Sequence, residues 1–247
     1  LNWKMKIVFQ FLFVSFPIFL LNQTINFEIL FGINFSGRLN YVLTILWILV
    51  LMNSINFIDN MDGFAAINSS FICIALTALS FVFNQNYLAD VSFVLLFSIL
   101  GFTIYNFPPA RIYMGDSGSL FIGFIFGFIS ILFDWNPTGQ SYLYSSIAPI
   151  FLFFTMPLLD FSTVFIHRIK NNISPTTGGT DHISHRLLNQ GLSVKSVLLL
   201  FSLLNIFIFL LLALTIAFES MSVIIFLIYV IIILTLFIKF QKLEPLN

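Results

Sequence analysis

NSINFIDNMDG, residues 53–63, and YNFPPARIYMGDSG, residues 105–118, are the two stretches around which this chain is organised. They hold dense groups of acidic and amide side chains in a sequence that is otherwise strongly apolar, and each follows a long apolar run. A carboxylate beside hydrocarbon is costly unless it faces water, a metal ion or a partner, so acids at the edge of such runs are functional candidates. We therefore expect the fold to bring these two stretches together.

The composition of the 247 residues is that of an integral membrane protein. Hydrophobic residues make up 59% and charged residues 8%, and the mean hydropathy of +1.04 lies outside the range of soluble domains. The apolar runs have the length of membrane-spanning helices and lack the alternation of barrel strands. The net charge of zero gives no argument for nucleic acid as a partner, and the single Cys73 excludes an internal disulfide. The sequence predicts an all-α, polytopic membrane protein.

The polar breaks divide the chain into eight predicted membrane-spanning segments. These are residues 7–22, 40–55, 65–84, 89–106, 119–133, 142–164, 195–218 and 221–239. The segments 40–55 and 119–133 are short, so we expect the neighbouring motifs to extend them. The chain begins with Leu1 and shows no signal peptide, and we expect one integral membrane domain over residues 1–247.

The basic residues predict the orientation of the chain in the membrane. With a cytoplasmic N-terminus, Arg38 is the one basic residue outside. The basic residues then inside are Lys4, Lys6, Arg111, Arg168, Lys170, Arg186, Lys195, Lys239 and Lys242. The same assignment puts both polar stretches and a third one, residues 167–190, on the cytoplasmic side. We therefore expect a shared site at that face.

In the first stretch, Asn53, Asn56, Asp59 and Asp62 follow one another at intervals of three residues. Such residues lie on neighbouring positions of one helix face until Gly63 ends the helix. Their oxygen atoms suit a hard cation such as Mg²⁺, or hydrogen bonds to a nucleoside. A helix end with polar caps facing water is the alternative, and four aligned polar groups fit it poorly.

In the second stretch, Pro108 and Pro109 stop the incoming helix, and residues 115–118, GDSG, predict a tight turn before the next span. An acid between glycines, here Asp116, lets a ligand approach the backbone closely. The helix that is expected to begin at Ser119 offers free amides to a phosphate. A simple helix cap remains the alternative interpretation of Asp116.

The third stretch, HRIKNNISPTTGGTDHISHRLLNQG, residues 167–191, contains all three histidines of the chain. His182 and His185 lie three residues apart with Arg186 beside them, so two imidazoles and a guanidinium could face one phosphate-sized space. A zinc site is disfavoured because Asp181 is the one further ligand nearby. Asp160 lies within an apolar run, and we expect it to hold the histidine loop in place.

Three ordered motifs give the chain a family resemblance. NSINFIDNMDG, NFPPARIYMGDSGSLFIG and SPTTGGTDHISHRL, between membrane spans, resemble the motifs of polyprenyl-phosphate N-acetylhexosamine-1-phosphate transferases, glycosyltransferase family 4. These proteins join a nucleotide-activated sugar phosphate to a lipid phosphate. The resemblance extends to about Phe240.

The resemblance implies a catalytic group and a cation. Asp116 matches the family's magnesium ligand, with Asn56 as a second ligand and Mn²⁺ as an alternative ion, and Asp59 and Asp62 match acids that line the nucleotide pocket. The catalytic residues implied are Asp59, Asp62, Asp116, His182 and His185.

The resemblance also implies residues that bind the substrates. They are Lys4, Asn53, Asn106, Tyr113 and Arg186. Tyr113 matches an aromatic residue that stacks on uracil, and Asn106 matches an asparagine of the sugar-nucleotide site. Arg186 belongs to the loop that holds the pyrophosphate, and Lys4 resembles a lysine that follows the family's first acidic motif.

That first motif is where the chain departs from the family. Relatives carry an adjacent pair of aspartates just before the stretch that matches LNWKMKIVFQ, and this chain starts after their position. The resemblance therefore implies about three further spans before Leu1 and about eleven in the complete protein. We expect the fragment alone to be inactive.

The function implied is transfer of a HexNAc-1-phosphate, here GlcNAc-1-phosphate, from a UDP-sugar to undecaprenyl phosphate, with release of UMP. This is the first membrane step of cell-wall or lipopolysaccharide biosynthesis, at the cytoplasmic face of the bacterial inner membrane. The partners implied are UDP-N-acetylhexosamine, undecaprenyl phosphate and the lipid bilayer, and a homodimer is left open.

Three alternative functions fit the sequence less well. A phospho-N-acetylmuramoyl-pentapeptide transferase usually has three consecutive histidines in its last loop, whereas this chain has DHISH. A multispan transporter would place polar groups near the bilayer midplane, and here they gather at one edge. The CDP-alcohol phosphotransferases carry a spaced acidic motif that is absent.

Overall fold

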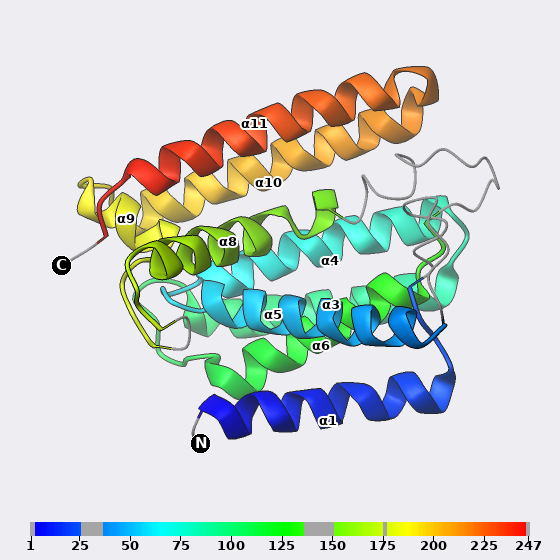
Figure 1. The fold of residues 1–247 in the computed structure, drawn as a ribbon. Coiled ribbons are helices and arrows are strands. Elements are labelled where there is room, and N and C mark those ends of the chain that lie inside the picture. Colours follow the sequence, from blue (N-terminus) through cyan, green and yellow to red (C-terminus); the bar gives the residue numbers. More distant parts are fainter. Residues whose placement is uncertain (1–2, 26–36, 136–150, 175–176, 246–247) are drawn as a thin grey trace.

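The all-α prediction is confirmed by the structure, a computed structural model that describes residues 3–25, 37–135, 151–174 and 177–245 (Figure 1). Within these ranges the chain forms helices joined by turns, and no strand occurs in them. The helices are α1 (Trp3–Leu21), α3 (Gly37–Ile58), α4 (Phe64–Val82), α5 (Asn86–Asn106), α6 (Gly115–Leu132), α8 (Thr155–Lys170), α9 (Ile183–Asn189), α10 (Val194–Ala217) and α11 (Ser222–Lys242). A 3₁₀ turn, η1 (Glu219–Met221), joins the last two helices.

Seven helices of the described ranges are long and apolar enough to cross a membrane. They are α1, α3, α4, α5, α6, α10 and α11. Each corresponds to one of the eight predicted segments. The eighth, 142–164, begins outside the described residues and continues as α8, which ends in a basic turn. The chain is thus a multi-pass membrane protein, and helices are the form in which such segments satisfy their backbone hydrogen bonds in lipid.

The two short predicted segments are extended by their motifs, as expected. α3 runs to Ile58 and includes Asn53 and Asn56, and α6 begins at Gly115 and includes Asp116. The expectation that the helix continues to Gly63 is wrong, because Asp59 and Asp62 lie in the turn after α3. The predicted turn over residues 115–118 is wrong, because these residues form the first turn of α6. Gly115 makes this early start possible, because its φ of +63° is a conformation that glycine adopts without strain and that turns the backbone sharply into α6.

The pair α3 and α6 packs closely because α6 carries two glycines one turn apart. A Cβ atom at Gly123 would lie 2.6 Å from the Cα atom of Met52, and one at Gly127 would lie 2.9 Å from Cγ2 of Ile48. Small residues at this spacing let two membrane helices approach each other. This contact fixes the start of α6, and with it Asp116, beside the end of α3.

We expect Gly123→Ala to destabilise the protein by about 1–3 kcal/mol, because the added carbon meets backbone that has no room to give. Gly101→Ala in α5 is the matched control, since nothing lies within 4 Å of its Cβ position. Thermal unfolding in detergent micelles checks the prediction. Equal melting of the two variants would contradict this account of the helix contact.

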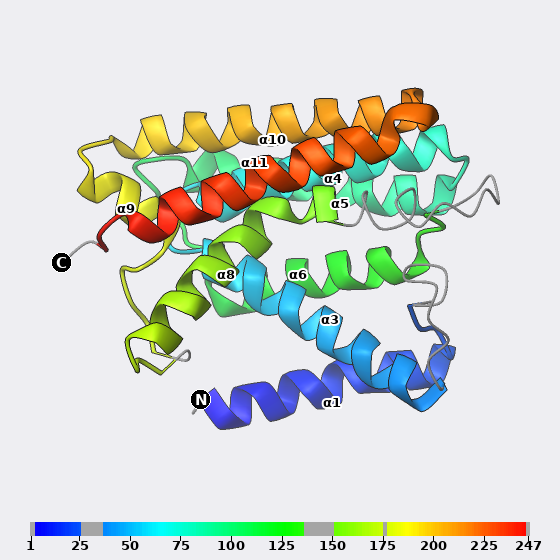
Figure 2. The ribbon, with the colours of Figure 1, turned by 45° about the horizontal axis from the view of Figure 1, so that its top comes forward.

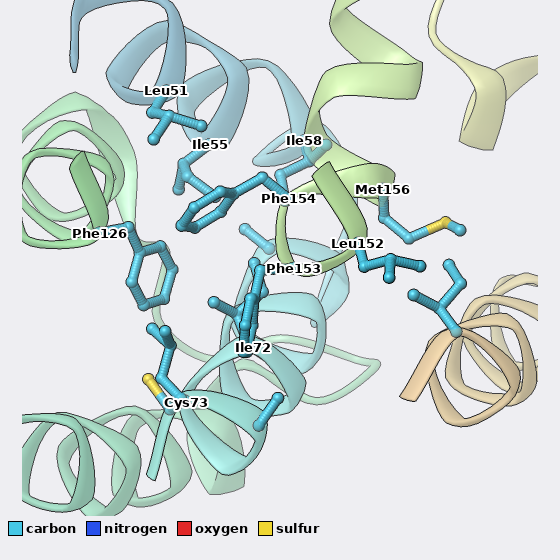
Figure 3. Packing of buried hydrophobic residues seen from close by; sticks show 14 of the residues in the cluster. Leu51, Ile55, Ile58, Ile72, Cys73, Phe126, Leu152, Phe153, Phe154 and Met156 are labelled. Atoms are coloured by element: carbon cyan, nitrogen blue, oxygen red, sulfur yellow. The ribbon is translucent and has the colours of Figure 1, made fainter. Parts of the chain in front are cut away.

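The apolar core lies between α3, α4, α6 and the residues before α8 (Figure 3). Leu51 and Ile55 of α3 face Phe126 of α6 and Phe154, and all four are fully buried. Cys73 of α4 is a free cysteine buried in the same cluster. α10 and α11 form an antiparallel pair on one side of this core (Figures 1 and 2).

The motif-bearing ends of the helices gather at one end of the bundle. The beginning of α1, the end of α3 and the end of α8 all lie on the left in both views (Figures 1 and 2). α9 and the end of α11 are at the same end. The polar stretches that are far apart in the sequence therefore meet.

Candidate functional site

A cavity of about 690 Å³ opens at this end of the bundle, between α1, α3, α8 and the segment before α9. Its polar lining comes from Lys6, Gln10, Asn53, Asn56, Asp59, Asn60, Arg168, His182 and residues 177–179. Its apolar lining comes from Trp3, Ile7, Leu46, Leu49, Val50, Phe57, Phe161 and Phe165. Most of the polar groups belong to helix ends or to the segment before α9, and the apolar groups largely to membrane-spanning helices. One space therefore joins a charged mouth to a hydrocarbon-like wall.

Lys6 links the first two motifs. Its Nζ atom lies 2.8 Å from Oδ2 of Asp116 and donates a hydrogen bond of 3.2 Å to Oδ1 of Asn56. The Asn56 Nδ2 atom in turn donates to Oδ1 of Asp116 at 2.9 Å and to Oγ of Ser119 at 2.9 Å. The end of α3 and the start of α6 are thus joined through charged and amide groups at the mouth of the cavity.

Asp59 lies next to this cluster, just beyond the end of α3. Burial raises the pKa of Asp59 to about 6; a hydrogen bond from the Gly115 backbone opposes this shift, and the negative charge of Asp116 adds to it. Two carboxylates therefore lie close together at the cavity mouth, and the charge of the pair changes near neutral pH.

The Lys6 ammonium marks a position suited to a cation. It contacts one oxygen of Asp116 and the oxygen of Asn56, the two side chains that the sequence predicted as metal ligands. Among the described residues, no group of three or more His, Cys, Asp and Glu side chains converges on a metal position. Mg²⁺ commonly takes one or two carboxylates and completes its shell with water and substrate phosphates, so the oxygens present fit this ion with a substrate bound.

Asp160 and His182 form a second polar pair. Asp160 is fully buried in α8, and its Oδ2 atom lies 2.8 Å from Nδ1 of His182. Its Oδ1 atom accepts a hydrogen bond of 2.7 Å from the backbone N–H of Ile183. The expectation that Asp160 holds the histidine loop is confirmed by these contacts.

Arg168, which lines the cavity, forms a buried ion pair with Asp181. Nε and Nη2 of Arg168 donate to the two carboxylate oxygens at 2.8 and 2.7 Å. Burial alone would raise the pKa of Asp181, but the bidentate guanidinium outweighs it and lowers that pKa below its ordinary value. The pair ties the segment 177–182 to the end of α8.

Asp62 and Asn106 connect the two motif loops and do not line the cavity. The Asp62 Oδ2 atom accepts from the backbone N–H of Ala110 at 3.0 Å. The Asn106 side chain accepts from the Gly63 N–H at 3.0 Å and donates to the Ile112 carbonyl at 2.8 Å. These contacts shape the loops, and the substrate roles of both residues remain predictions.

The structure brings some sequence-predicted residues together and separates others. Asn53, Asn56, Asp59 and His182 line the cavity, and Asp116 adjoins it through Lys6. His185 lies behind His182, with ring centroids 6.3 Å apart. Burial and the nearby His182 lower the pKa of His185, which is therefore neutral at pH 7.

Besides Asn106, three predicted substrate-binding residues are not at the cavity. The Lys4 Nζ atom lies over the Trp3 ring, 5.6 Å from its centroid, and Tyr113 is 77% exposed on the outside of its loop. Arg186 is 1% exposed and donates to main-chain carbonyls at the end of α11, so its guanidinium does not share a space with the imidazoles as the spacing suggested. A seven-residue helix, α9, turns it inward.

Lys6, Gln10 and Arg168 line the cavity although sequence reasoning gave them no role in the site. Lys6 and Gln10 are four residues apart on one face of α1, a spacing that could have marked a polar face on an apolar helix. The Gln10 Oε1 atom accepts from Asn53 Nδ2 at 3.1 Å, which ties α1 to α3. Arg168 follows His167 at the end of a span, where a basic residue is common at the membrane interface.

Fold and site together define a multi-pass membrane protein with a charged cavity at the ends of its spans. Residues 1–134 match the family model for glycosyl transferase family 4, which is more than half of the chain, and the chain belongs to this family.

Curated relatives carry names of one type of reaction. A probable undecaprenyl-phosphate N-acetylglucosaminyl 1-phosphate transferase of Bacillus subtilis is 36% identical over 173 residues, which are 70% of this chain and 47% of that protein. A decaprenyl-phosphate N-acetylglucosaminephosphotransferase of Mycobacterium leprae is 33% identical over 174 residues, 64% of this chain and 44% of that protein. A phospho-N-acetylmuramoyl-pentapeptide-transferase of Moorella thermoacetica is 36% identical over 91 residues, 37% of this chain and 29% of that protein. The chain spans about half, or less, of the length of these relatives.

Proposed function

We propose that this chain is part of an enzyme that transfers GlcNAc-1-phosphate from UDP-GlcNAc to undecaprenyl phosphate, giving a polyprenyl-diphosphate-sugar and UMP. The observation that carries the proposal is the cavity, which has a charged mouth at the helix ends and an apolar wall along α3 and α8. A lipid phosphate carries a long apolar tail, whereas a sugar nucleotide is polar and charged. A site that joins the two must offer an apolar and a charged environment.

The apolar wall suits the isoprenoid acceptor. Leu46, Leu49 and Val50 follow one another along α3 below Asn53, and Phe161 and Phe165 face the cavity from α8. Burial of hydrocarbon against such residues is favourable, and the tail would enter from the membrane without crossing water. The phosphate would then lie at the level of Lys6 and Asn56.

The charged mouth suits the two phosphate-bearing substrates. An oxygen of the lipid phosphate must attack the β-phosphorus of the nucleotide while UMP leaves, and the two anions repel each other. Cationic groups fixed in place lower this repulsion, and Lys6 and Arg168 line the same space. These side chains would bind and orient the phosphates before the reaction begins.

A magnesium ion completes this proposal, with Asp116 as its ligand and Asn56 beside it. Lys6 would move from these oxygens to a substrate phosphate when the ion binds. The ion would neutralise charge on the diphosphate. Asp59, next to Asp116, would add negative charge that favours the cation.

The setting proposed is the bacterial cytoplasmic membrane, with the cavity mouth on the cytoplasmic side where nucleotide sugars are made. The basic residues near the mouth support this orientation. A UDP-MurNAc-pentapeptide donor is the second candidate, because pentapeptide transferases are among the relatives. The DHISH sequence favours the GlcNAc donor.

A transfer assay with the complete protein tests the proposed function. Membranes that contain it are incubated with radiolabelled UDP-GlcNAc, undecaprenyl phosphate and MgCl₂, and label extractable into butanol is counted. Label in the lipid fraction that depends on the added acceptor supports the proposal. Transfer from UDP-MurNAc-pentapeptide alone would replace it with the second candidate, and no transfer from either donor would reject it.

The pKa of Asp59 predicts how the reaction depends on pH. Below about pH 6 this carboxyl is protonated, so its attraction for a cation is lost and the transfer rate should fall. The fold has the opposite preference: a raised pKa means that the folded state binds the proton more tightly, so stability falls as pH rises from about 4 to 6. Asp59→Asn should therefore raise the melting temperature at pH 7 while it lowers the rate and removes the acid limb.

Rates and melting curves at pH 5 to 8 check this prediction, with Asp90→Asn on the exposed surface of α5 as control. More Mg²⁺ should move the acid limb to lower pH, because the cation and the proton compete for the same charge. An acid limb that persists in Asp59→Asn would assign it to another group.

A further inference from the structure

The fully buried carboxylate of Asp160 forms its hydrogen bonds with two consecutive residues, His182 and Ile183. Its two oxygens bond to Nδ1 of His182 and to the N–H of Ile183, at 2.8 and 2.7 Å. A buried carboxylate is unfavourable unless such partners satisfy it. The hydrogen bonds from His182 and Ile183, at the start of α9, thus compensate for the loss of water around the Asp160 carboxylate.

The two bonds of Asp160 restrain His182 in different ways. Ile183 is the first residue of α9, and its N–H is one of the amides that a helix start leaves without a partner. The bond to Oδ1 therefore fixes the backbone at His182. The bond to Oδ2 fixes the ring itself, which also lies edge-on to Phe57 with centroids 5.6 Å apart.

The ring orientation decides which nitrogen a ligand meets. With Asp160 ionised, Nδ1 carries a proton and donates it to the carboxylate. Nε2 lies on the opposite side of the ring from this bond, and His182 is part of the cavity lining. Nε2 is therefore the nitrogen that is available to a ligand in the cavity.

We propose that Asp160 is a positioning residue: it holds His182 in the Nδ1-protonated form and directs the Nε2 lone pair into the cavity, where it accepts a hydrogen bond from a hydroxyl of the bound sugar nucleotide. The inference rests on the proposed function for the identity of the ligand, but the orientation of the ring does not depend on it. Carboxylates that orient a histidine from behind act in this way in other sites, and their loss commonly lowers activity about 10–100-fold.

Other charged groups near His182 are arranged differently. Arg168 and Asp181 bond to each other, His185 lies 6.3 Å away ring to ring, and Asp59 lies in the turn after α3. Among the described residues, Asp160 is the carboxylate that lies within bonding distance of the ring, 2.8 Å from Nδ1. A change of tautomer at His182 is thus expected from Asp160 substitutions and not from the others.

Asp160→Asn tests the proposal most directly, because the amide keeps the shape of the carboxyl and changes its hydrogen bonding. Its oxygen can still accept from Ile183 N–H, while its NH₂ group now faces Nδ1 and favours the tautomer with the proton on Nε2. We expect kcat/KM for transfer to fall about 10–100-fold with the melting temperature little changed. Thr163→Val, a buried polar residue one turn along α8 whose hydroxyl bonds to its own helix, is the matched control and should keep full activity.

A double-mutant cycle separates positioning from a merely structural role. If Asp160 acts through His182, Asp160→Asn should lower kcat/KM no further in a His182→Gln background. An equal loss in both backgrounds would overturn the proposal, because Asp160 would then act independently of the imidazole.

¹⁵N NMR of histidine-labelled complete protein in detergent micelles tests the ring directly and needs no turnover. The chemical shifts of the His182 ring, assigned by its loss in His182→Gln, should report a protonated Nδ1 in the wild type and a protonated Nε2 in Asp160→Asn. A wild-type ring with its proton on Nε2 alone would overturn the inference even if transfer is observed. The expected tautomers in a protein that transfers no sugar would retain the positioning role and reject the proposed function.

Discussion

Asp116→Asn should abolish transfer in the complete protein, with a loss of at least about 1,000-fold, because the charge at the centre of the proposed cation site is removed. The substitution keeps the size of the side chain. It takes away the partner of Lys6, which lies 2.8 Å from Oδ2, and leaves Asn56 facing an amide in place of a carboxylate. The radiolabel transfer assay measures the effect.

The same substitution should leave the fold nearly intact. The Asp116 side chain is 67% exposed, and an ion pair in such a setting contributes little to stability. Ser117→Ala, at the exposed neighbouring position, should keep near-normal activity. Near-normal turnover of Asp116→Asn would reject the metal assignment, whereas a protein that no longer folds would show that Asp116 is structural.

The ends of the helices could be predicted from the sequence because local chemistry sets them. Apolar runs of membrane length end at polar motifs, Pro108 stops α5, and Gly63 adopts a φ of +73° before α4 begins. The meeting of the motifs also followed from alternating helix directions. These features depend on composition and order, which a single sequence displays.

The directions in which individual side chains point could not be predicted in the same way. Lys4 and Lys6 lie on the same turn of α1, and the apolar residues of this helix form no stripe, so the spacing of Lys6 and Gln10 is the one sign of its inner face in the sequence. The rotation of α1 about its own axis, where it packs on α3, determines which lysine points to the site, and it is Lys6. The resemblance pointed to Lys4, and packing selected its neighbour.

A similar limit explains why the sequence pointed to Arg186 as a residue of the site, whereas Arg168 lines the cavity. Both arginines lie in the third polar stretch, and the sequence offered spacing alone to choose between them. Arg186 is drawn to the carbonyls of Asp181, Phe240 and Leu243 because the end of α11 packs against α9. That contact joins residues more than fifty positions apart, which helical spacing does not reveal.

The buried pair of Arg168 and Asp181 gives the second large expected effect, and it is one of stability. Arg168 is 3% exposed and Asp181 is 8% exposed. Removing one partner from a buried pair typically destabilises a protein by about 3–5 kcal/mol, because the remaining charge loses its compensation. Asp181→Asn should therefore lower the melting temperature strongly and weaken substrate binding, since residues 177–179 of the cavity wall belong to the same segment.

The two halves of the pair should not be equivalent. After Arg168→Leu, the Asp181 carboxyl can take up a proton and become neutral, whereas after Asp181→Asn the guanidinium keeps its charge. Asp181→Asn should thus be the more harmful change. In the wild type the pKa of Asp181 is lowered, so the stability that the pair contributes is lost as pH falls below the ordinary value of 3.8. The Arg168→Leu variant should lack this loss and recover stability as pH falls. Melting curves in detergent that extend from neutral pH to well below this value measure both trends, with the exposed Lys170→Ala at the end of α8 as control. If Asp181→Asn melts with the control, or if the double variant shows no coupling between the two positions, then the pair does not hold the cavity wall.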